Sequence, residues 1–189
     1  MSAQERGRER LQEAPIVPPP PGSVADLFRE TLPDVELSAS QGVLDVILTI
    51  KREDLSRVMR AAKDDPRLAF DYLRCLSGVD QLEQGLEVVY HLYSFRHGHN
   101  VTIKALLPLE DPRVATVSHL WEAADWHERE AAEMFGILFE GHPNPAPLLL
   151  EEGLGYYPLR REHRLVEVEE HQEMFLVRGE KEAEEAEEG

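Results

Sequence analysis

Residues 86–107 read LEVVYHLYSFRHGHNVTIKALL, two apolar runs joined by a short polar connection. Both runs are rich in β-branched and aromatic residues, which are typical of strands, and Gly98 lies in the connection between them. This pattern predicts a hairpin in which 86–95 pairs with 100–107.

The segment before this hairpin contributes a further strand and a helix. In residues 43–50 (VLDVILTI), apolar side chains recur at every second position from Leu44 to Ile50, the period of a half-buried strand. Residues 53–64 form the helix, because apolar side chains recur there at helical spacing and Pro66 follows just beyond. These apolar residues are Leu55, Val58, Met59 and Ala62.

Two further helices are expected on either side of these elements. Ser23 and Asp26 have the spacing of a capping box and open a short helix that Pro33 ends. The dipeptide Asp111-Pro112 places an N-cap residue before a proline at the first helical position. It predicts a helix that runs toward Leu120.

The order of these elements indicates an α+β fold: a small, mostly antiparallel sheet with helices packed on it, followed by an extended C-terminal arm. Residues 70–80 (FDYLRCLSGVD) have no clear period and stay unassigned. The chain is expected to divide into a disordered proline-rich leader at 1–22, a core domain at 23–140, an extended docking arm at 141–178 and an acidic disordered tail at 179–189.

A helix that begins with three consecutive charges is expected at 126–135. Asp125 suits the N-cap, and Gly136 suits the left-handed position after the last turn. Helical spacing places Glu128 on one face with Ala124, Ala131 and Phe135, so a carboxylate interrupts an apolar stripe. An unpaired buried carboxylate is costly, so we expect at least one of the three charges to have a partner.

Two interpretations of the triplet Glu128-Arg129-Glu130 remain open. In the first, Glu128 closes a capping box with Asp125, and Arg129 pairs with Glu133 four residues on. In the second, Arg129 or Glu130 faces another protein chain. A catalytic carboxylate pair is disfavoured, because Glu128 and Glu130 point in different directions on a helix and cannot flank one bond.

After a short strand at 137–139, the residues from 141 to 165 are too rich in proline for a helix and too apolar for a free linker. Such an arm must lie on a surface, either that of its own domain or that of a neighbour. A single small domain offers little surface for it, which favours the neighbour. Its large apolar residues are Leu148, Leu149, Leu150, Leu154, Tyr156, Tyr157 and Leu159.

The composition narrows the classes of function. The 37 acidic residues exceed the 20 Lys and Arg residues, and the formal charge of −17 disfavours binding to nucleic acid. A single cysteine, Cys75, excludes an internal disulfide and an iron–sulfur cluster bound by this chain alone. No apolar run is long enough to span a membrane, and the N-terminus lacks the apolar stretch of a signal peptide, so we expect a soluble or peripheral protein made in the cytoplasm.

The stretch from Leu120 to Pro143, LWEAADWHEREAAEMFGILFEGHP, resembles the signature of the C subunit of the proton-translocating NADH:quinone oxidoreductase, respiratory complex I. The Glu-Arg-Glu, Phe-Gly-Ile and Gly-His-Pro elements at these separations carry the resemblance. Weaker similarity extends upstream through FDYLRCLSGVD, LEVVYHLYS and EDPRVATV, and downstream through PLRRE at 158–162.

This resemblance implies a non-catalytic structural subunit of the peripheral arm, packed against the D subunit, which contributes the quinone site, and near the B and I subunits. It implies no cofactor, metal or small-molecule ligand in this chain, with flavin and iron–sulfur clusters in partner subunits. The location would be peripheral, on the cytoplasmic side of the bacterial plasma membrane. The residues carried over as interface residues are Glu128, Arg129, Glu130, Phe135, Gly136, His142, Pro143 and Arg160.

The chain departs from the family pattern at two places. After Gly-His-Pro the family usually has an acidic or amide residue and then Leu-Arg-Arg, whereas this chain has Asn144-Pro145-Ala146-Pro147. The family's Pro-Leu-Arg-Lys-Asp-Tyr becomes PLRREH at 158–163. This divergence keeps open the equivalent subunit of a membrane-bound hydrogenase or of a ferredoxin-fed quinone reductase.

Other classes of function have less support. His91, His97 and His99 could suggest a zinc site, but no clear third ligand accompanies the pair around Gly98, so a turn with exposed histidines is favoured. His142 is similarly expected to be an ordinary loop histidine. No hydrolase motif and no nucleotide-binding glycine loop occurs. A free-standing acidic adaptor stays open, and it would purify as a monomer.

Overall fold

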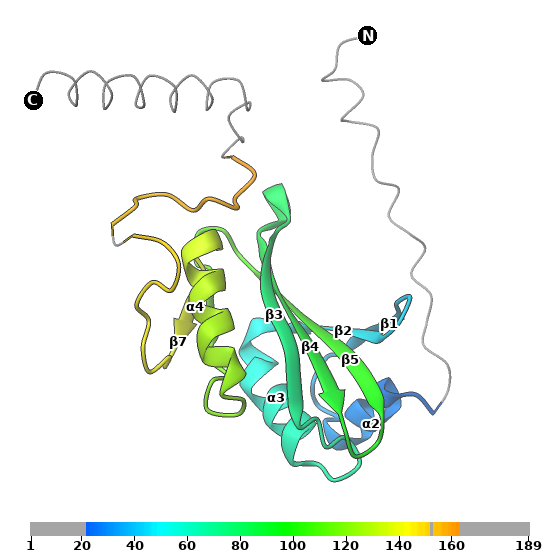
Figure 1. Ribbon diagram of the computed structural model, residues 1–189. Helices are drawn as coiled ribbons and strands as arrows, with labels where there is room; N and C mark the ends of the chain where they lie inside the picture. Colours follow the sequence, from blue (N-terminus) through cyan, green and yellow to red (C-terminus); the bar gives the residue numbers. More distant parts are fainter. Residues whose placement is uncertain (1–21, 152, 163–189) are drawn as a thin grey trace, which may run out of the picture. The chain divides into compact units, whose positions relative to one another are not determined.

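The computed structural model describes residues 22–151 and 153–162 (Figure 1). The chain divides into two units, Met1–Leu159 and Arg160–Gly189, and every helix and strand named below lies in the first. The expected leader at 1–22, apart from Gly22, lies outside the described residues, as do the arm beyond 162 and the acidic tail at 179–189. The domain boundaries therefore stay a prediction.

A five-stranded sheet with the order β1-β2-β5-β4-β3 forms the centre of the first unit (Figure 1). All neighbours in it are antiparallel except β2 and β5. The α+β class with a mostly antiparallel sheet is thus confirmed. The strands are β1 (Ser38–Gln41), β2 (Val46–Lys51), β3 (Tyr72–Asp80), β4 (Leu86–Ser94) and β5 (His99–Leu107), and β6 (Arg113–Ala115) pairs in parallel with β7 (Leu138–Glu140) in a second, two-stranded sheet.

The hairpin predicted at 86–107 is confirmed by β4 and β5. Its register runs without interruption from the pair Leu86↔Leu107 to the pair Ser94↔His99. Tyr90 and Ile103 face each other across it and are fully buried. The apolar, β-branched composition therefore reflects two central strands of the sheet, which is where such residues pack best.

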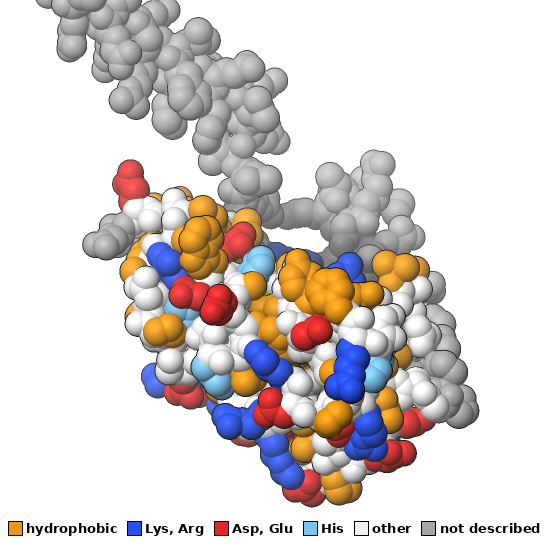
Figure 2. Space-filling model, turned by 60° about the horizontal axis from the view of Figure 1, so that its bottom comes forward, with side chains coloured by type: hydrophobic (Ala, Val, Ile, Leu, Met, Phe, Trp, Pro, Cys, Tyr) orange, Lys and Arg blue, Asp and Glu red, His pale blue; other side chains and the backbone are white. Residues whose placement is uncertain are grey.

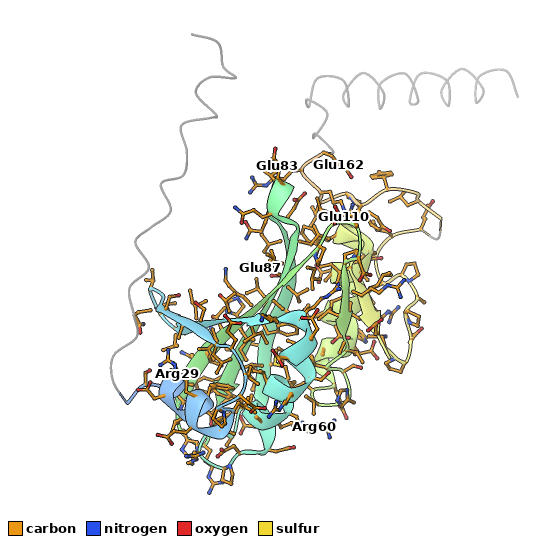
Figure 3. The ribbon with its side chains drawn as sticks, turned by 180° about the vertical axis from the view of Figure 1, so that it is seen from behind. Arg29, Arg60, Glu83, Glu87, Glu110 and Glu162 are labelled. Atoms are coloured by element: carbon orange, nitrogen blue, oxygen red, sulfur yellow. The ribbon has the colours of Figure 1, made fainter. Side chains whose placement is uncertain are left out.

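Helices α2 (Val24–Thr31) and α3 (Leu55–Asp64) lie together on one face of the sheet, as Figure 3 shows from behind. The four apolar residues that predicted the second helix are all fully buried in α3, after a single 3₁₀ turn, η1 (Arg52–Asp54). At α2, Ser23 is the N-cap but makes no side-chain cap bond, and the Asp26 carboxylate accepts the Gly22 amide at 2.7 Å. Neither side-chain bond of a capping box joins Ser23 and Asp26, so the expected capping box is wrong.

The strand expected at 43–50 begins later than its sequence pattern suggests. Val43 and Leu44 lie in the turn between β1 and β2 and are 100% and 84% exposed. The Gly42 amide donates to the Asp45 carbonyl at 2.8 Å and closes this turn. The chain must reverse here because β1, an edge strand without a clear sequence signal, pairs with β2.

The helix predicted from Asp111-Pro112 toward Leu120 is wrong. Val114 is buried in strand β6, which pairs with β7 more than twenty residues downstream. The N-cap signal depends only on neighbouring residues and carries no information about a partner strand so far along the chain. The pairing with β7 therefore overrides the local preference for a helix. The ambiguous stretch at 70–80 is the edge strand β3, preceded by two residues without regular structure.

Helix α4 (Ala123–Phe135) lies alongside β3 (Figure 1) and carries the charged triplet. It begins three residues earlier than predicted, with Glu122 and not Asp125 at the N-cap. Its packing on β3 depends on Gly78, where an added Cβ would lie 2.5 Å from Phe135 Cδ2. The glycine therefore allows helix and strand to approach closely.

Candidate functional site

Glu128 is fully buried, at 0% exposure, on the face of α4 that also buries Ala124 and Ala131. Its carboxylate turns away from the helix terminus and binds the segment after β6. The Val117 amide donates to Oε1 at 2.7 Å, and the Thr116 hydroxyl donates to Oε2. The apolar stripe broken by a carboxylate is thus confirmed, whereas the capping box with Asp125 is wrong.

The burial of this carboxylate changes its proton affinity. Desolvation raises the pKa of Glu128 from 4.5 to about 7, although the bonds from Thr116 and Val117 oppose the rise and nearby Asp125 adds to it. Burial, with the charge of Glu128, also raises the pKa of Tyr90 well above its ordinary value of 10. Glu128 is therefore a buried acid that changes charge near neutral pH, held by hydrogen bonds and not by a cation.

His142 completes this buried cluster and is not an ordinary exposed loop histidine. Its side chain is 3% exposed, and its Nε2 lies 3.6 Å from Asp125 Oδ1 and 3.7 Å from Glu128 Oε2. The Asn144 amide donates to Nδ1 at 3.1 Å, so Nδ1 carries no proton. Nε2–H then donates to the Asp125 carbonyl at 3.1 Å, and the ring joins the start of the arm to α4.

Arg129 and Glu133 hold the next part of the arm against α4. Arg129 donates from Nε to the Ala146 carbonyl at 2.7 Å and from Nη2 to the Pro147 carbonyl at 2.9 Å. Glu133 accepts three consecutive amides, those of Leu148, Leu149 and Leu150, at 3.0–3.2 Å. The predicted pairing of Arg129 with Glu133 is therefore wrong, because backbone groups of the arm bind both side chains.

The helix end is built as the sequence predicts. Gly136 adopts a left-handed conformation (φ 74°), and its amide donates to the Ala132 carbonyl at 2.8 Å. Phe135, half-buried, packs against the core. Together they turn the chain sharply into β7, from which Gly141 and His142 lead into the arm.

Three predicted interface residues remain, Glu130, Pro143 and Arg160. Glu130 and Pro143 are exposed, and Arg160 is the first residue of the second unit and is half-buried. Thr116, Asp125 and Glu133 take part in the site but were not predicted as site residues. Only Glu133 had a signal, its position one turn from Arg129; Thr116 lies far from the helix in sequence and had none.

The side of the arm that does not touch α4 is exposed and apolar. The Leu149 side chain is 64% exposed although its amide is bound by Glu133, and Leu159 is 54% exposed although its amide donates to the Met134 carbonyl at 3.1 Å. A cavity of about 160 Å³ lies between α4, β7 and the arm, with Glu128 and His142 in its wall. Its remaining lining is Arg113, Arg129, Ala132, Ile137, Leu138, Phe139, Glu140 and Pro145.

The histidines around Gly98 bind backbone groups. His97 Nε2 lies 2.7 Å from the Pro66 carbonyl, and His99 Nε2 lies 2.8 Å from the Leu68 carbonyl, with the His99 ring against Phe70. Within 22–151 and 153–162 no group of three or more His, Cys, Asp or Glu residues is placed to bind a metal ion. His99 is only partly exposed, which differs from the expected turn with exposed histidines.

Among the helices that the structure describes, none has the length and apolar character required to cross a bilayer. The geometry of the site is that of a helix and an arm joined by exposed and part-buried polar contacts, with Leu149 and Leu159 exposed on the arm.

Comparisons with known proteins agree on one family. The family model described as respiratory-chain NADH dehydrogenase, 30 Kd subunit, matches residues 48–169. The C subunit of NADH-quinone oxidoreductase from Chloroherpeton thalassium is 46% identical over 107 residues, covering 56% of this chain and 45% of that relative. The same subunit from a Roseiflexus species is 37% identical over 142 residues, covering 74% of this chain and 82% of that relative.

Two solved structures have a similar fold. A trypsin-resistant fragment of Nqo5 superposes with a TM-score of 0.54 at 29% identity, over 64% of this chain and 97% of that fragment. A chain of the membrane-bound sulfane sulfur reductase, an archaeal respiratory membrane complex, superposes with a TM-score of 0.66 at 23% identity, over 79% of this chain and 88% of that chain.

Proposed function

Since the chain belongs to the family of the respiratory-chain NADH dehydrogenase 30 Kd subunit, we propose that it is a non-catalytic structural subunit in the peripheral arm of an NADH:quinone oxidoreductase. It supports electron transfer from NADH to quinone, coupled to proton translocation, by packing against the D subunit at the quinone site. The B and I subunits lie nearby. Its place is peripheral, on the cytoplasmic side of a bacterial plasma membrane.

The observation that carries this proposal is the arm held by Arg129 and Glu133. Two charged side chains bind five consecutive residues of the arm through the backbone, from Ala146 to Leu150, and leave the Leu149 side chain 64% exposed. Hydrogen bonds to its backbone hold the arm in one conformation but bury little of its apolar surface. An ordered apolar surface of this kind is typical of a protein–protein interface.

In this proposal the cofactors are bound by partner subunits. This chain holds no flavin, cluster, metal or small-molecule ligand, and partner subunits carry the electrons. Its single cysteine agrees with that assignment, because a cluster requires several thiolates. The charged triplet then serves assembly: Glu128 and Arg129 position the helix and the strap, and the exposed Glu130 is available to another chain.

The proposal is tested by purifying the tagged full chain from gently solubilised membranes. We expect quinone-reductase subunits, including iron–sulfur proteins, to be recovered with it in near-equal amounts. A chain that emerges as a monodisperse monomer, with no cluster-bearing protein, would contradict the proposal and favour a free-standing adaptor. A stoichiometric flavin or metal in the isolated chain would also contradict it.

A second assembly is supported by one observation, the fold shared with a chain of the archaeal sulfane sulfur reductase complex. The same type of subunit could serve a membrane-bound hydrogenase or a ferredoxin-fed quinone reductase. The purified assembly separates these cases, because oxidation of NADH identifies the first class. Activity with ferredoxin or hydrogen and none with NADH identifies the second.

A further inference from the structure

The hairpin between β3 and β4 ends in a tip that projects from the sheet (Figure 1) and carries an exposed leucine. The tip is the 3₁₀ turn η2 (Leu82–Gln84). Leu82 is 52% exposed and has a φ of 57°, in the left-handed region. Branched apolar residues rarely adopt this conformation, so the tip combines backbone strain with an exposed apolar side chain.

Hydrogen bonds on both sides hold Leu82 in this conformation. The Leu82 amide donates to Asp80 Oδ1 at 2.8 Å, and its carbonyl accepts the Gly85 amide at 3.1 Å. The Gln81 amide donates to the Gly85 carbonyl at 2.9 Å and closes the turn. Because the Leu82 side chain is exposed, packing within its own domain does little to offset the backbone strain. Backbone strain of this kind is more common at residues that bind a ligand or a partner.

A groove of about 270 Å³ lies beside the tip, between it and the segment that follows β5. Its lining is polar and apolar in equal parts, and the apolar part includes Leu106 and Leu109, which are 44% and 40% exposed. Gly85 is required at its base, because an added Cβ would lie 2.2 Å from the Leu107 carbonyl oxygen. The residues that line this tip groove are Glu83, Gln84, Gly85, Leu106, Pro108, Leu109 and Glu110.

Both charged residues of the tip groove are acidic. Glu83 and Glu110 lie at the same end of the molecule (Figure 3), and neither has an ion-pair partner among the described residues. Glu87, on β4 just after the tip, differs, because Lys104 Nζ binds its Oε2 at 3.0 Å. Figure 2, in which the bottom of Figure 1 comes forward, shows Lys and Arg side chains interspersed with Asp and Glu side chains on that face. The groove therefore combines two exposed leucines with unpaired negative charge.

We propose that the tip groove is a docking site for a Lys or Arg side chain of a neighbouring protein chain. The aliphatic part of that side chain would lie on Leu106 and Leu109, and its charged head would meet Glu83 and Glu110. Lys and Arg side chains commonly bind in this way: the aliphatic stem packs on apolar groups, and the charged end pairs with a carboxylate. Leu82, next to Glu83 in the same turn, would offer the neighbour a further exposed apolar side chain. This surface is separate from the arm, and it rests on the proposed function only in that the neighbour belongs to the same assembly.

The first test uses the isolated full chain and needs no partner. It is titrated with the peptide acetyl-Leu-Arg-Leu-Lys-Leu-amide while the methyl resonances of Leu106 and Leu109 are followed by NMR. We expect saturable shifts at these two residues, weakened about tenfold in the E83Q/E110Q variant. The matched control, E36Q/D64N, removes two exposed carboxylates elsewhere and should titrate like the wild type. Absence of saturable shifts, or equal weakening in the control, would overturn the proposal.

The second test uses the purified assembly. The E83K/E110K variant should be retained about tenfold less than the wild type after a wash at moderate salt, and the E36K/D64K variant should be retained normally. Recovery of partners by the wild type tests the proposed function; the difference between the two variants tests the groove. Equal retention of both variants would overturn the docking site and leave the proposed function intact.

A further variant replaces Leu82, the residue with the strained backbone. Its two measurements, the melting temperature of the isolated chain and retention in the assembly, should not fall together. L82G relieves the backbone strain, so the melting temperature of the isolated chain should stay equal or rise, while retention in the assembly falls. A merely structural role for Leu82 predicts that both readouts fall together, and that result would overturn its part in docking.

Discussion

Arg129 and Glu133, one helical turn apart on α4, bind opposite polar groups of the same strap. Arg129 donates to two carbonyls, at 146 and 147, and Glu133 accepts three amides, at 148 to 150. A cation thus meets carbonyl oxygens and an anion meets a run of N–H groups, so each charge is satisfied by backbone dipoles. This arrangement orders the arm at a helix surface and leaves Leu149 exposed, while Leu148 and Leu150 are half-buried.

Removal of either side chain of this pair should loosen the arm locally. In Glu133→Ala the amides of Leu148, Leu149 and Leu150 lose their acceptor and should exchange with solvent at least about tenfold faster. Global stability should fall by only about 1 kcal/mol, because the strap is largely exposed. Hydrogen exchange by mass spectrometry measures the first effect and chemical denaturation the second.

The matched control is Glu130→Ala, which removes an exposed carboxylate from the same helix. It should leave exchange at 148–150 unchanged. If both variants loosened the arm equally, the effect would come from the charge of the helix and not from the bonds to the arm.

Glu128 should make the stability of the chain depend on pH near neutrality. Its pKa rises from 4.5 in the unfolded chain to about 7 in the folded one, so the folded state binds the proton more tightly. Its stabilising contribution is complete below pH 4.5 and is lost as the pH rises through 7, by roughly 3 kcal/mol in total. Glu128→Gln should remove this slope, which denaturation at several pH values measures as the difference from the wild type. A difference that does not change between pH 4.5 and 7.5 would show that Glu128 is ionised throughout.

His142 should stabilise the start of the arm through both ring nitrogens. His142→Ala breaks the bonds to the Asp125 carbonyl and the Asn144 amide and leaves a void beside Glu128, so stability should fall by about 2 kcal/mol. The neighbouring exposed Pro143, changed to Ala, should cost less than about 0.5 kcal/mol. Equal effects in thermal unfolding would refute a special role for the histidine.

Gly78→Ala should separate α4 from β3, because the new methyl group would lie 2.5 Å from Phe135 Cδ2. We expect a loss of about 1–3 kcal/mol, as is usual for overpacking. Phe135→Leu in the same background should recover part of that loss, whereas alone it should destabilise. A double-mutant cycle measured by denaturation decides, and strictly additive effects would contradict the contact.

Leu149→Ser tests the outer side of the arm. The side chain is 64% exposed, so the isolated chain should keep its stability within about 0.5 kcal/mol. If the arm docks on a partner, recovery of the assembly should fall about tenfold. Val43→Ser, a change at a fully exposed turn, is the control and should assemble normally. Normal assembly of both variants would remove Leu149 from the interface.

Several elements could be predicted from the sequence because their signals are local. The β4–β5 hairpin, the buried face of α3 and the left-handed Gly136 each depend on residues close together in the chain. The predicted helix at 111–120 failed for the opposite reason. Its N-cap and proline were local signals, but the segment gained more from pairing with β7.

The candidate site was predicted only in part. Helical spacing correctly placed Glu128 among apolar residues and showed that it required a partner. It could not show that the partners were Thr116 and Val117, because the side chain reaches a segment that precedes its own helix. Likewise, the spacing of Arg129 and Glu133 predicted an ion pair, which the backbone of the arm displaced.

The sequence by itself determined the central hairpin, the amphipathic helices and the family signature, since each is a matter of residue type at short spacing. Only the tertiary structure decided which groups the buried and half-buried charges meet: Glu128 the segment after β6, Arg129 and Glu133 the arm, and His142 the helix it follows. The physical reason is the cost of leaving a charge unsatisfied. A charge binds the best donor or acceptor that folding brings to it, and here those groups lie eleven to eighteen residues away in the chain.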